Sequence, residues 1–183
     1  MRALSIDAQN KESKEIEIHL QANTVYTFFN SILIDELSCI NEHIVYTDAE
    51  ALEKNKEAYF IGEQLVIGDA LILGRDSFED LEASIPLNEI SSLVKHELNA
   101  FYSQVIDLLR SSEMNLYRSF EIDVAGEKLQ LNPEWVLYTF NLADDKTKQY
   151  FIDELKKVVE QKSSSLDYIK RMATLAIRSG ATA

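Results

Sequence analysis

Apolar and polar residues alternate in two short stretches near the start of the chain. The first is Met1–Asp7 and the second is Glu15–Leu20, with the polar residues 8–14 between them. A period of two is typical of strands that bury one face. The pattern therefore predicts an N-terminal antiparallel hairpin.

The stretch that follows has helical rather than alternating spacing. Apolar side chains recur at intervals of three and four residues over Ala22–Leu37, at Val25, Phe28, Phe29, Ile32, Leu33 and Leu37. This spacing predicts an amphipathic helix over that range. Alternation returns over Cys39–Tyr46 and predicts a strand. Thr47 and Glu50 have the spacing of a capping box, which predicts a short helix to about Lys56.

Three of the five glycines lie at intervals of six within residues 62–74. A phosphate-binding loop needs glycines set closer together, and three turns are too few for a β-solenoid. Gly68 and Asp69 stand between the apolar runs Gln64–Ile67 and Ala70–Leu73, and Gly-Asp is typical of two-residue hairpin turns. We therefore expect those two runs to pair with each other.

The second half of the chain has mainly helical spacing. Residues 75–84 are mostly acidic and predict a loop, and a long helix is expected from Leu87 to about Ser111. Alternation over Leu116–Val124 and Glu127–Leu131 predicts a second hairpin. Three helices are expected to follow, near 133–141, 145–162 and 164–179.

Together these elements predict an α+β fold. An N-terminal antiparallel sheet with a packed helix is followed by a mainly helical C-terminal part that contains one β-hairpin. The change from strands to helices predicts a sheet-rich domain over 1–86 and a mainly helical domain over 87–183, or one continuous domain.

Charge is distributed unevenly along the chain. Residues 1–145 carry 10 Lys and Arg against 27 Asp and Glu, whereas residues 146–183 carry 8 against 4. An acidic body repels phosphates, so direct nucleic-acid binding by residues 1–145 is not expected. The basic tail could contact a nucleic acid or an acidic partner, or its Lys and Arg could simply line the solvent face of terminal helices.

The composition also indicates the cellular compartment in which the protein is expected. Cys39 is the single cysteine and cannot form an internal disulfide, so nothing indicates an oxidising environment. No apolar run approaches the length of a membrane span, and no basic start precedes an apolar stretch. We expect a cytoplasmic protein without membrane contact.

The titratable residues show no pattern typical of a catalytic or metal site. His19, His43 and His96 are widely separated, and His96-Glu97 lacks the second histidine of a zinc-protease motif because Ala100 stands in its place. We therefore predict no catalytic residue, no metal and no cofactor. The carboxylates of the expected acidic loop form a candidate interaction surface: Asp76, Glu79, Asp80 and Glu82.

Three stretches carry a resemblance to a known family: Met1–Asp7, Ile44–Leu52 (IVYTDAEAL) and Gly68–Gly74 (GDALILG). Over about residues 1–95 the chain resembles a domain-of-unknown-function family of small proteins encoded in phages, plasmids and integrated elements. The last stretch more often reads GNALILG in that family, so Asp69 is a departure. The resemblance implies a mobile-element accessory protein without an assigned activity, and it transfers no catalytic residues.

Three kinds of function agree with these observations to different degrees. The first expectation is a non-enzymatic accessory protein of a mobile element that binds another protein. One alternative is an acidic DNA mimic that inhibits a host nuclease or restriction system, because carboxylates can stand in for phosphates. The other is a small-ligand-binding protein or hydrolase whose site forms only in the folded chain.

Overall fold

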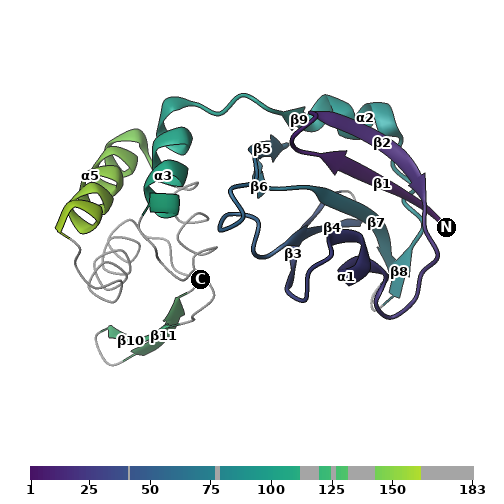
Figure 1. Ribbon diagram of the computed structural model, residues 1–183, viewed down its shortest axis with the longest axis horizontal. Helices are drawn as coiled ribbons and strands as arrows, with labels where there is room; N and C mark the ends of the chain where they lie inside the picture. The colour runs from purple at the N-terminus through teal and green to yellow at the C-terminus, as the bar shows by residue number, and fades with distance from the viewer. Residues whose placement is uncertain (41, 77–78, 112–119, 125–126, 132–142, 162–183) are drawn as a thin grey trace. The chain divides into compact units, whose positions relative to one another are not determined.

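The computed structural model describes residues 1–161 except 41, 77–78, 112–119, 125–126 and 132–142 (Figure 1). The chain forms two compact units, Met1–Leu98 and Asn99–Ala183. The predicted boundary after residue 86 differs from this division by twelve residues, which fold with the first unit. Whether either unit is an independent domain stays a prediction.

The larger sheet of the first unit is antiparallel throughout, with the strand order β2-β1-β7-β4-β3 and with β8 paired to β7. Its strands are β1 (Arg2–Asp7), β2 (Glu12–Glu17), β3 (Ile34–Ile40), β4 (His43–Asp48), β7 (Ala70–Asp76) and β8 (Glu79–Leu81). β1 and β2 form the predicted N-terminal hairpin. The α+β class and the N-terminal antiparallel sheet are therefore confirmed.

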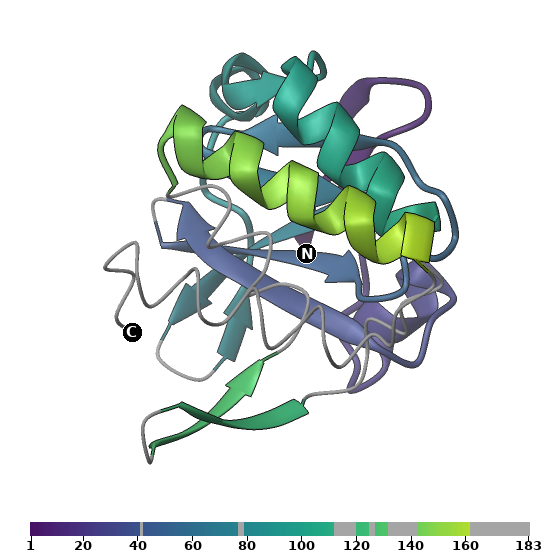
Figure 2. The ribbon, with the colours of Figure 1, turned by 90° about the vertical axis from the view of Figure 1, so that its left-hand side faces the viewer.

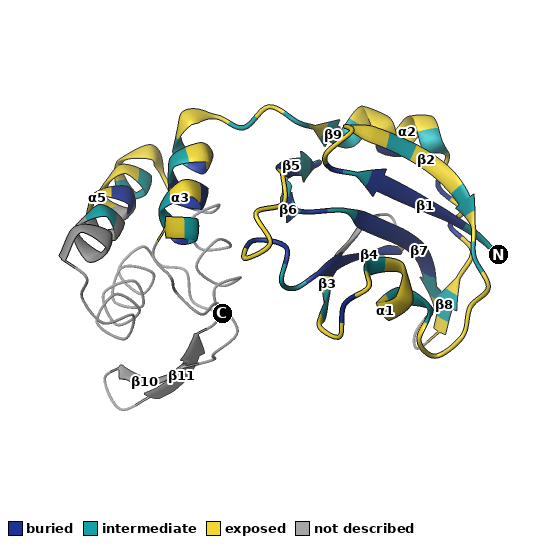
Figure 3. Cartoon of the chain, viewed as in Figure 1, coloured by how far each residue is buried: buried dark blue, intermediate teal, exposed yellow. Residues whose placement is uncertain are grey.

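β7 is the central strand of this sheet and is buried on both faces, as its dark colour in Figure 3 shows. Alternate residues along it therefore enter two different cores. Ala70 and Ile72 belong to the first core, and Leu71 and Leu73 belong to the second. This double burial explains why Ala70–Leu73 is an unbroken apolar run rather than an alternating one.

The first core is shared with a second, smaller sheet. That sheet contains β5 (Ala58–Ile61), β6 (Gln64–Ile67) and β9 (Val94–Lys95) in the order β6-β5-β9, and the helix α2 (Leu87–Leu93) precedes β9. Both sheets and α2 contribute buried side chains, among them Leu4, Val45, Tyr59, Val66, Ile72 and Ile90. Because apolar burial is the dominant favourable term in folding, this core joins the two sheets into one unit.

The second core lies on the opposite face of the larger sheet, where the helix α1 (Thr24–Phe29) covers it with Val25 and Phe29. A helix of six residues is too short to be stable alone, so packing and local hydrogen bonds must hold it. The Thr24 hydroxyl accepts the Gln21 amide at 2.7 Å and donates to the His19 carbonyl at 2.7 Å. Those bonds fix the chain as it enters α1.

The predicted helix over Ala22–Leu37 is wrong beyond Phe29. Asn30 has the left-handed backbone conformation (φ 49°), which ends α1, and the chain then extends into β3. Residues of β3 pair with β4 from Ile34↔Asp48 to Leu37↔Val45. Pairing with a neighbouring strand therefore overrides the helical spacing of the apolar residues.

The predicted strand over Cys39–Tyr46 is wrong in its bounds, and the short helix predicted after it is wrong altogether. β3 ends at Ile40 and β4 begins at His43, and Ile40 and His43 are paired across the turn that contains Glu42 (φ 65°). β4 continues through Asp48, and residues 49–55 form turns rather than a helix. The positive φ at Glu42 divides the expected strand into the two arms of a hairpin.

Asp48 organises those turns in place of the expected capping box. Its Oδ1 accepts the Glu50 amide at 3.0 Å and the Ser31 hydroxyl at 2.8 Å, and its Oδ2 lies 2.7 Å from Lys54 Nζ. Burial would raise the pKa of Asp48, but the hydrogen bonds from Lys54, Glu50 and Ser31 outweigh it and lower that pKa below its usual value. The Ser31 bond also anchors the chain directly after α1.

The predicted hairpin around Gly68 and Asp69 is wrong. β6 pairs with β5, and β7 pairs with β1 and β4, so the chain passes from one sheet to the other at these two residues. The tight turn is instead Gly62-Glu63, which joins β5 to β6 with Gly62 at φ 62°. Asp69 accepts the Ala8 amide at 2.9 Å and so ties the crossing to β1.

Substituting Gly68 should destabilise the protein more than substituting Gly62. Both glycines have positive φ, so an alanine at either position costs about 1–2 kcal/mol of backbone strain. At Gly68 a Cβ would also lie 2.8 Å from the Ala51 Cβ, whereas at Gly62 it would meet nothing within 4 Å. We expect Gly68→Ala to cost a further 1–3 kcal/mol, roughly, from overpacking, measured by urea denaturation. Equal losses would contradict the close approach to Ala51.

The predicted acidic loop over residues 75–84 is largely strand. β7 extends to Asp76, and β8 pairs with it from Gly74↔Leu81 to Asp76↔Glu79. A side chain at position 74 would overlap the carbonyl oxygen of Glu82, so glycine permits the close approach of the returning chain. The many carboxylates in this range obscure the alternation of apolar and polar residues that would indicate a strand.

The single long helix predicted from Leu87 to Ser111 is wrong. α2 ends at Leu93, and β9 then pairs with β5 through Phe60↔Lys95 and Ile61↔Val94. A new helix, α3 (Ala100–Ser111), begins after Asn99. The side-chain oxygen of Asn99 accepts the amides of Phe101 and Tyr102 at 3.0 and 3.2 Å, the arrangement of a helix N-cap.

The described part of the second unit contains two helices and a hairpin. They are α3, β10 (Phe120–Val124) paired with β11 (Glu127–Leu131), and α5 (Asp145–Gln161). α3 and α5 lie side by side, as Figures 1 and 2 both show. The predictions of this hairpin and of a helix near 145–162 are confirmed. The helices expected at 133–141 and 164–179 lie outside the described residues, so a mainly helical C-terminal part stays a prediction.

Candidate functional site

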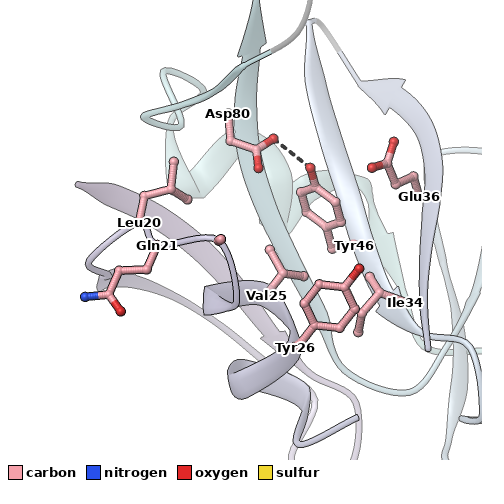
Figure 4. Close-up of a pocket in the computed structure, with 9 residues that line it drawn as sticks. Leu20, Gln21, Val25, Tyr26, Ile34, Glu36, Tyr46 and Asp80 are labelled. Atoms are coloured by element: carbon pink, nitrogen blue, oxygen red, sulfur yellow. Dashed lines mark hydrogen bonds between the residues drawn. The ribbon is translucent and has the colours of Figure 1, made fainter. Parts of the chain in front are cut away.

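A cleft of about 410 Å³ lies beside α1 in the first unit (Figure 4). One wall is formed by residues 20–26, which lead into α1 and begin it. The other wall is formed by side chains from β3, β4 and β8, namely Ile34, Glu36, Tyr46 and Asp80. The cleft therefore joins segments that are far apart in the sequence.

Tyr46 and Asp80 form the polar centre of the cleft. The Tyr46 hydroxyl donates to Asp80 Oδ1 at 2.6 Å, and this bond links β4 to β8 (Figure 4). Burial and the adjacent Asp80 carboxylate raise the pKa of Tyr46 far above its usual value. The phenol therefore stays protonated and acts as a hydrogen-bond donor, not as a base or a nucleophile.

Glu36 and Arg75 form an ion pair near this centre. Arg75 Nη1 lies 2.7 Å from Glu36 Oε2, and both side chains are partly exposed. Both charges also act on the Tyr46 hydroxyl, Glu36 raising and Arg75 lowering its pKa. With Asp80, the group has two carboxylates and one guanidinium, so its formal charge is negative.

The wall on the α1 side is apolar and partly exposed. Leu20, Val25 and Tyr26 contribute to it, and 47% of Tyr26 is exposed. The cleft thus offers an aliphatic and aromatic surface next to carboxylate oxygens that accept hydrogen bonds. This arrangement suits recognition of another molecule, because it positions acceptors and apolar area without an activated nucleophile.

Large exposed hydrophobic side chains concentrate on the segment around α1. Five of the seven found in the described residues lie within residues 20–33. We call these five the α1 surface: Leu20, Tyr26, Phe28, Ile32 and Leu33. In α1, Tyr26, Thr27 and Phe28 are exposed and the other residues are partly buried (Figure 3). Exposed apolar residues scattered singly are ordinary, so the concentration of five within residues 20–33 makes this segment a candidate for an interaction site.

The four carboxylates of the predicted interaction surface do not form one cluster, although Asp76 and Glu79 are cross-strand partners. Only Asp80 lines the cleft. Glu79 is the next residue along β8 and so points to the other face of that strand, opposite Asp76 in register. Glu82 Oε1 accepts the Arg2 amide at 3.2 Å. Whether the other three carboxylates contact a partner stays a prediction.

His43 is buried, and its ring links two segments of the first unit. Nδ1 lies 3.1 Å from the Ile40 carbonyl, and Nε2 accepts the amides of Ser84 and Ile85 at 2.9 and 3.1 Å. The ring is therefore in the neutral form that carries its proton on Nδ1. Its burial could have been inferred from the alternation along β4, where His43 shares a face with Val45.

The Ser84 hydroxyl lies 3.2 Å from His43 Nε2, a distance that suggests a serine–histidine pair. Activation of a serine requires the imidazole lone pair to accept the serine proton. Two backbone amides already use the one lone pair of Nε2. The geometry is therefore that of a structural link rather than of an activated nucleophile.

The other two histidines lie apart from the cleft. His19 is exposed, and the ring of His96 lies 5.4 Å from the ring of Tyr59. Burial and the charge of Lys11 lower the pKa of His96. Across the described residues, no three His, Cys, Asp or Glu side chains are grouped so that they could hold a metal ion.

A second cleft of about 360 Å³ lies in the first unit at the turn after β1 and is more polar. Two of its three acidic side chains bind the local backbone: Asp7 accepts the Asn10 amide at 2.8 Å, and Asp69 accepts the Ala8 amide at 2.9 Å. These bonds stabilise the turn and the crossing between the sheets. The cleft beside α1 is therefore the stronger candidate for recognition.

Comparison with protein-family models, with curated proteins and with solved structures finds no match to this chain. The resemblance to a phage and plasmid family therefore stays a prediction. No described helix has the length and apolar character that crossing a membrane requires. The arrangement around α1 is the feature that bears most directly on function.

Proposed function

We propose that this protein is a non-enzymatic accessory protein of a mobile element and binds another protein through the α1 surface and the adjoining cleft. One observation carries the proposal: five large hydrophobic side chains are exposed within residues 20–33. The setting in a mobile element, a cytoplasmic location and a mainly helical C-terminal part belong to the same proposal. They rest on the sequence patterns and on the resemblance.

The composition of this surface is that of a protein-binding site. Removing apolar area from water contributes roughly 25 cal/mol per Å², so exposed Ile32 and Phe28 favour association once a partner covers them. Interface cores are enriched in aromatic residues and are surrounded by polar groups. Tyr26 supplies an aromatic side chain here, and Glu36 and Asp80 supply the polar groups.

The two alternative functions have less support. A DNA mimic needs carboxylates presented as phosphates are, but Asp80 is hydrogen-bonded to Tyr46 and Glu82 to the Arg2 backbone. A hydrolase with a histidine base needs a free imidazole lone pair, and that of His43 accepts two amides. Both alternatives stay predictions, and the salt dependence measured in the following experiment separates the DNA mimic from the proposal.

Capture from a bacterial lysate with matched tyrosine variants tests the proposal. Tyr26→Ser removes an aromatic ring from the α1 surface, and Tyr150→Ser removes one of similar exposure from α5, 49% against 47%. We expect a partner that wild type and Tyr150→Ser retain and that Tyr26→Ser loses. It should also remain bound in 1 M salt, because apolar contacts are not screened although the Debye length falls to about 3 Å.

Two results would contradict the proposal. Retention of the partner by Tyr26→Ser would place the binding site elsewhere on the protein. Release at moderate salt, with a nuclease as the captured protein, would favour the DNA mimic, since binding between exposed charges weakens as ionic strength rises.

A further inference from the structure

We infer that the cleft beside α1 receives a positively charged side chain, arginine or lysine, that a protein partner presents between apolar residues. This inference rests on the proposed function, because it assigns the chemistry of the partner that the α1 surface binds. The carboxylates, the protein's own guanidinium and the apolar wall each support it.

Asp80 supplies a fixed acceptor in the cleft. The Tyr46 hydroxyl holds Oδ1 at 2.6 Å and so orients the carboxylate. A carboxylate has about four acceptor positions, and Tyr46 uses one of them. Asp80 therefore keeps the capacity to accept hydrogen bonds from a guanidinium or an ammonium group, and charge-assisted bonds of this kind are the stronger ones.

The ion pair of Arg75 shows that a carboxylate near the cleft binds a guanidinium group. The Arg75 guanidinium lies 2.7 Å from Glu36 Oε2. One guanidinium cannot neutralise both Glu36 and Asp80, so a negative charge remains beside the apolar wall. The first unit, residues 1–98, is also strongly acidic, with 19 Asp and Glu against 7 Lys and Arg. An anionic ligand such as a phosphate would be repelled, whereas a cationic side chain would be attracted.

The apolar wall fits the remainder of an arginine or lysine side chain. Such side chains place their methylene groups on apolar surface while the charged end reaches polar partners. Leu20 and Val25 offer aliphatic surface, and the exposed ring of Tyr26 offers an aromatic face that attracts cations. Apolar residues that flank the basic one in the partner would contact the exposed side chains of Leu20 and Tyr26.

Selection from a library of random peptides displayed on phage provides the test. We expect peptides enriched on the wild-type protein to contain an arginine or lysine flanked by apolar residues. Replacing that arginine by citrulline, or that lysine by acetyl-lysine, removes the charge from the peptide and leaves the protein unchanged. Each replacement should weaken binding about tenfold or more, measured as a dissociation constant.

Two protein variants locate the charge that is recognised. Asp80→Asn removes the charge but keeps an oxygen that can accept the Tyr46 hydroxyl, and it should weaken the selected peptide about tenfold. Glu79→Gln removes one charge from the same strand but outside the cleft, and it should change binding less than about twofold. Equal effects of the two variants would overturn the inference in favour of a diffuse acidic surface.

The peptide selection distinguishes failure of the inference from failure of the proposed function. Enriched apolar peptides without a basic residue, bound equally by wild type and Asp80→Asn, would overturn the inference and leave the proposed function standing. Peptides that bind Tyr26→Ser as well as they bind wild type would overturn both, and so would the absence of any enriched peptide. The citrulline and acetyl-lysine comparisons use the wild-type protein, so they test the inference even if Asp80→Asn is unstable.

Discussion

Replacing Ile72 by alanine will lower the free energy of unfolding by about 2–5 kcal/mol. Ile72 is 0% exposed in the central strand β7, opposite Leu4 on one side and Val45 on the other. Its side chain belongs to the core that the two sheets share. Removal of the buried methyl and methylene groups loses transfer free energy and leaves a cavity, which urea denaturation of the purified variant will measure.

Ile32→Ala is the matched control for this prediction. Ile32 is 85% exposed in the α1 surface, so the same deletion should change the free energy of unfolding by about 0.5 kcal/mol or less. An equal loss in the two variants would contradict the assignment of Ile72 to the core and of Ile32 to the surface. If the proposed function is right, Ile32→Ala will instead weaken binding of the partner.

Replacing His43 by alanine will cost about 2–5 kcal/mol of stability. The change leaves the amides of Ser84 and Ile85 and the Ile40 carbonyl without their partner, and each buried unsatisfied group costs about 1–3 kcal/mol. Water can satisfy part of this loss, so the sum is not fully additive. Urea denaturation will give the total, and hydrogen exchange at Ser84 and Ile85 will show the local loss of protection.

Ser84→Ala distinguishes the contribution of the Ser84 hydroxyl from that of the backbone amides that His43 accepts. The backbone amide of Ser84 remains in this variant, so we expect less than about 1 kcal/mol of destabilisation. His19→Ala, at an exposed histidine, should have a similarly small effect. A loss at Ser84→Ala as large as that at His43→Ala would mean that the hydroxyl, and not the amides, is the important partner.

Local patterns predicted the elements whose partners are close in sequence. The β1–β2 hairpin and the β10–β11 hairpin followed from alternation around short polar turns, and α5 followed from helical spacing. In each case the alternation or helical spacing lies within the element, and each hairpin pairs two strands that are adjacent in the sequence. Sequence patterns predict such elements well, because the backbone geometry of a helix or a strand alone sets the interval at which residues return to the same face.

Elements in which strand pairing competes with helical spacing were predicted wrongly. The apolar residues of 22–37 and of 87–111 fit a helix, but the first range contains the start of β3, which pairs with the next strand β4, and the second contains β9, which pairs with the distant strand β5. Asn30 and Asn99, which end α1 and start α3, are the local signals that could have divided those helices. Gly62 and Gly68 each follow an isoleucine and precede an acidic residue, but only Gly62 lies in a hairpin turn. The arrangement of the two sheets, and not the local sequence, decides which glycine does so.

Only one residue of the candidate site could be named from the sequence. Asp80 was named as part of an acidic set, but its partner Tyr46 lies 34 positions away, and no local pattern joins the two. The predicted long helix places three of the five residues of the α1 surface on its apolar face, namely Phe28, Ile32 and Leu33. One signal was available: residues 20–33 hold more large apolar side chains than a single buried face of a short helix can cover.

The dissociation constant of the captured partner for purified wild-type, Tyr26→Ser and Tyr150→Ser proteins tests most directly whether the α1 surface binds a protein. Loss of an aromatic residue near the centre of an interface commonly costs tenfold or more in affinity, whereas loss of one outside the interface costs little. We predict that Tyr26→Ser weakens binding at least about tenfold and that Tyr150→Ser changes it less than about twofold. Equal dissociation constants for Tyr26→Ser and wild type would contradict the proposed role of the α1 surface.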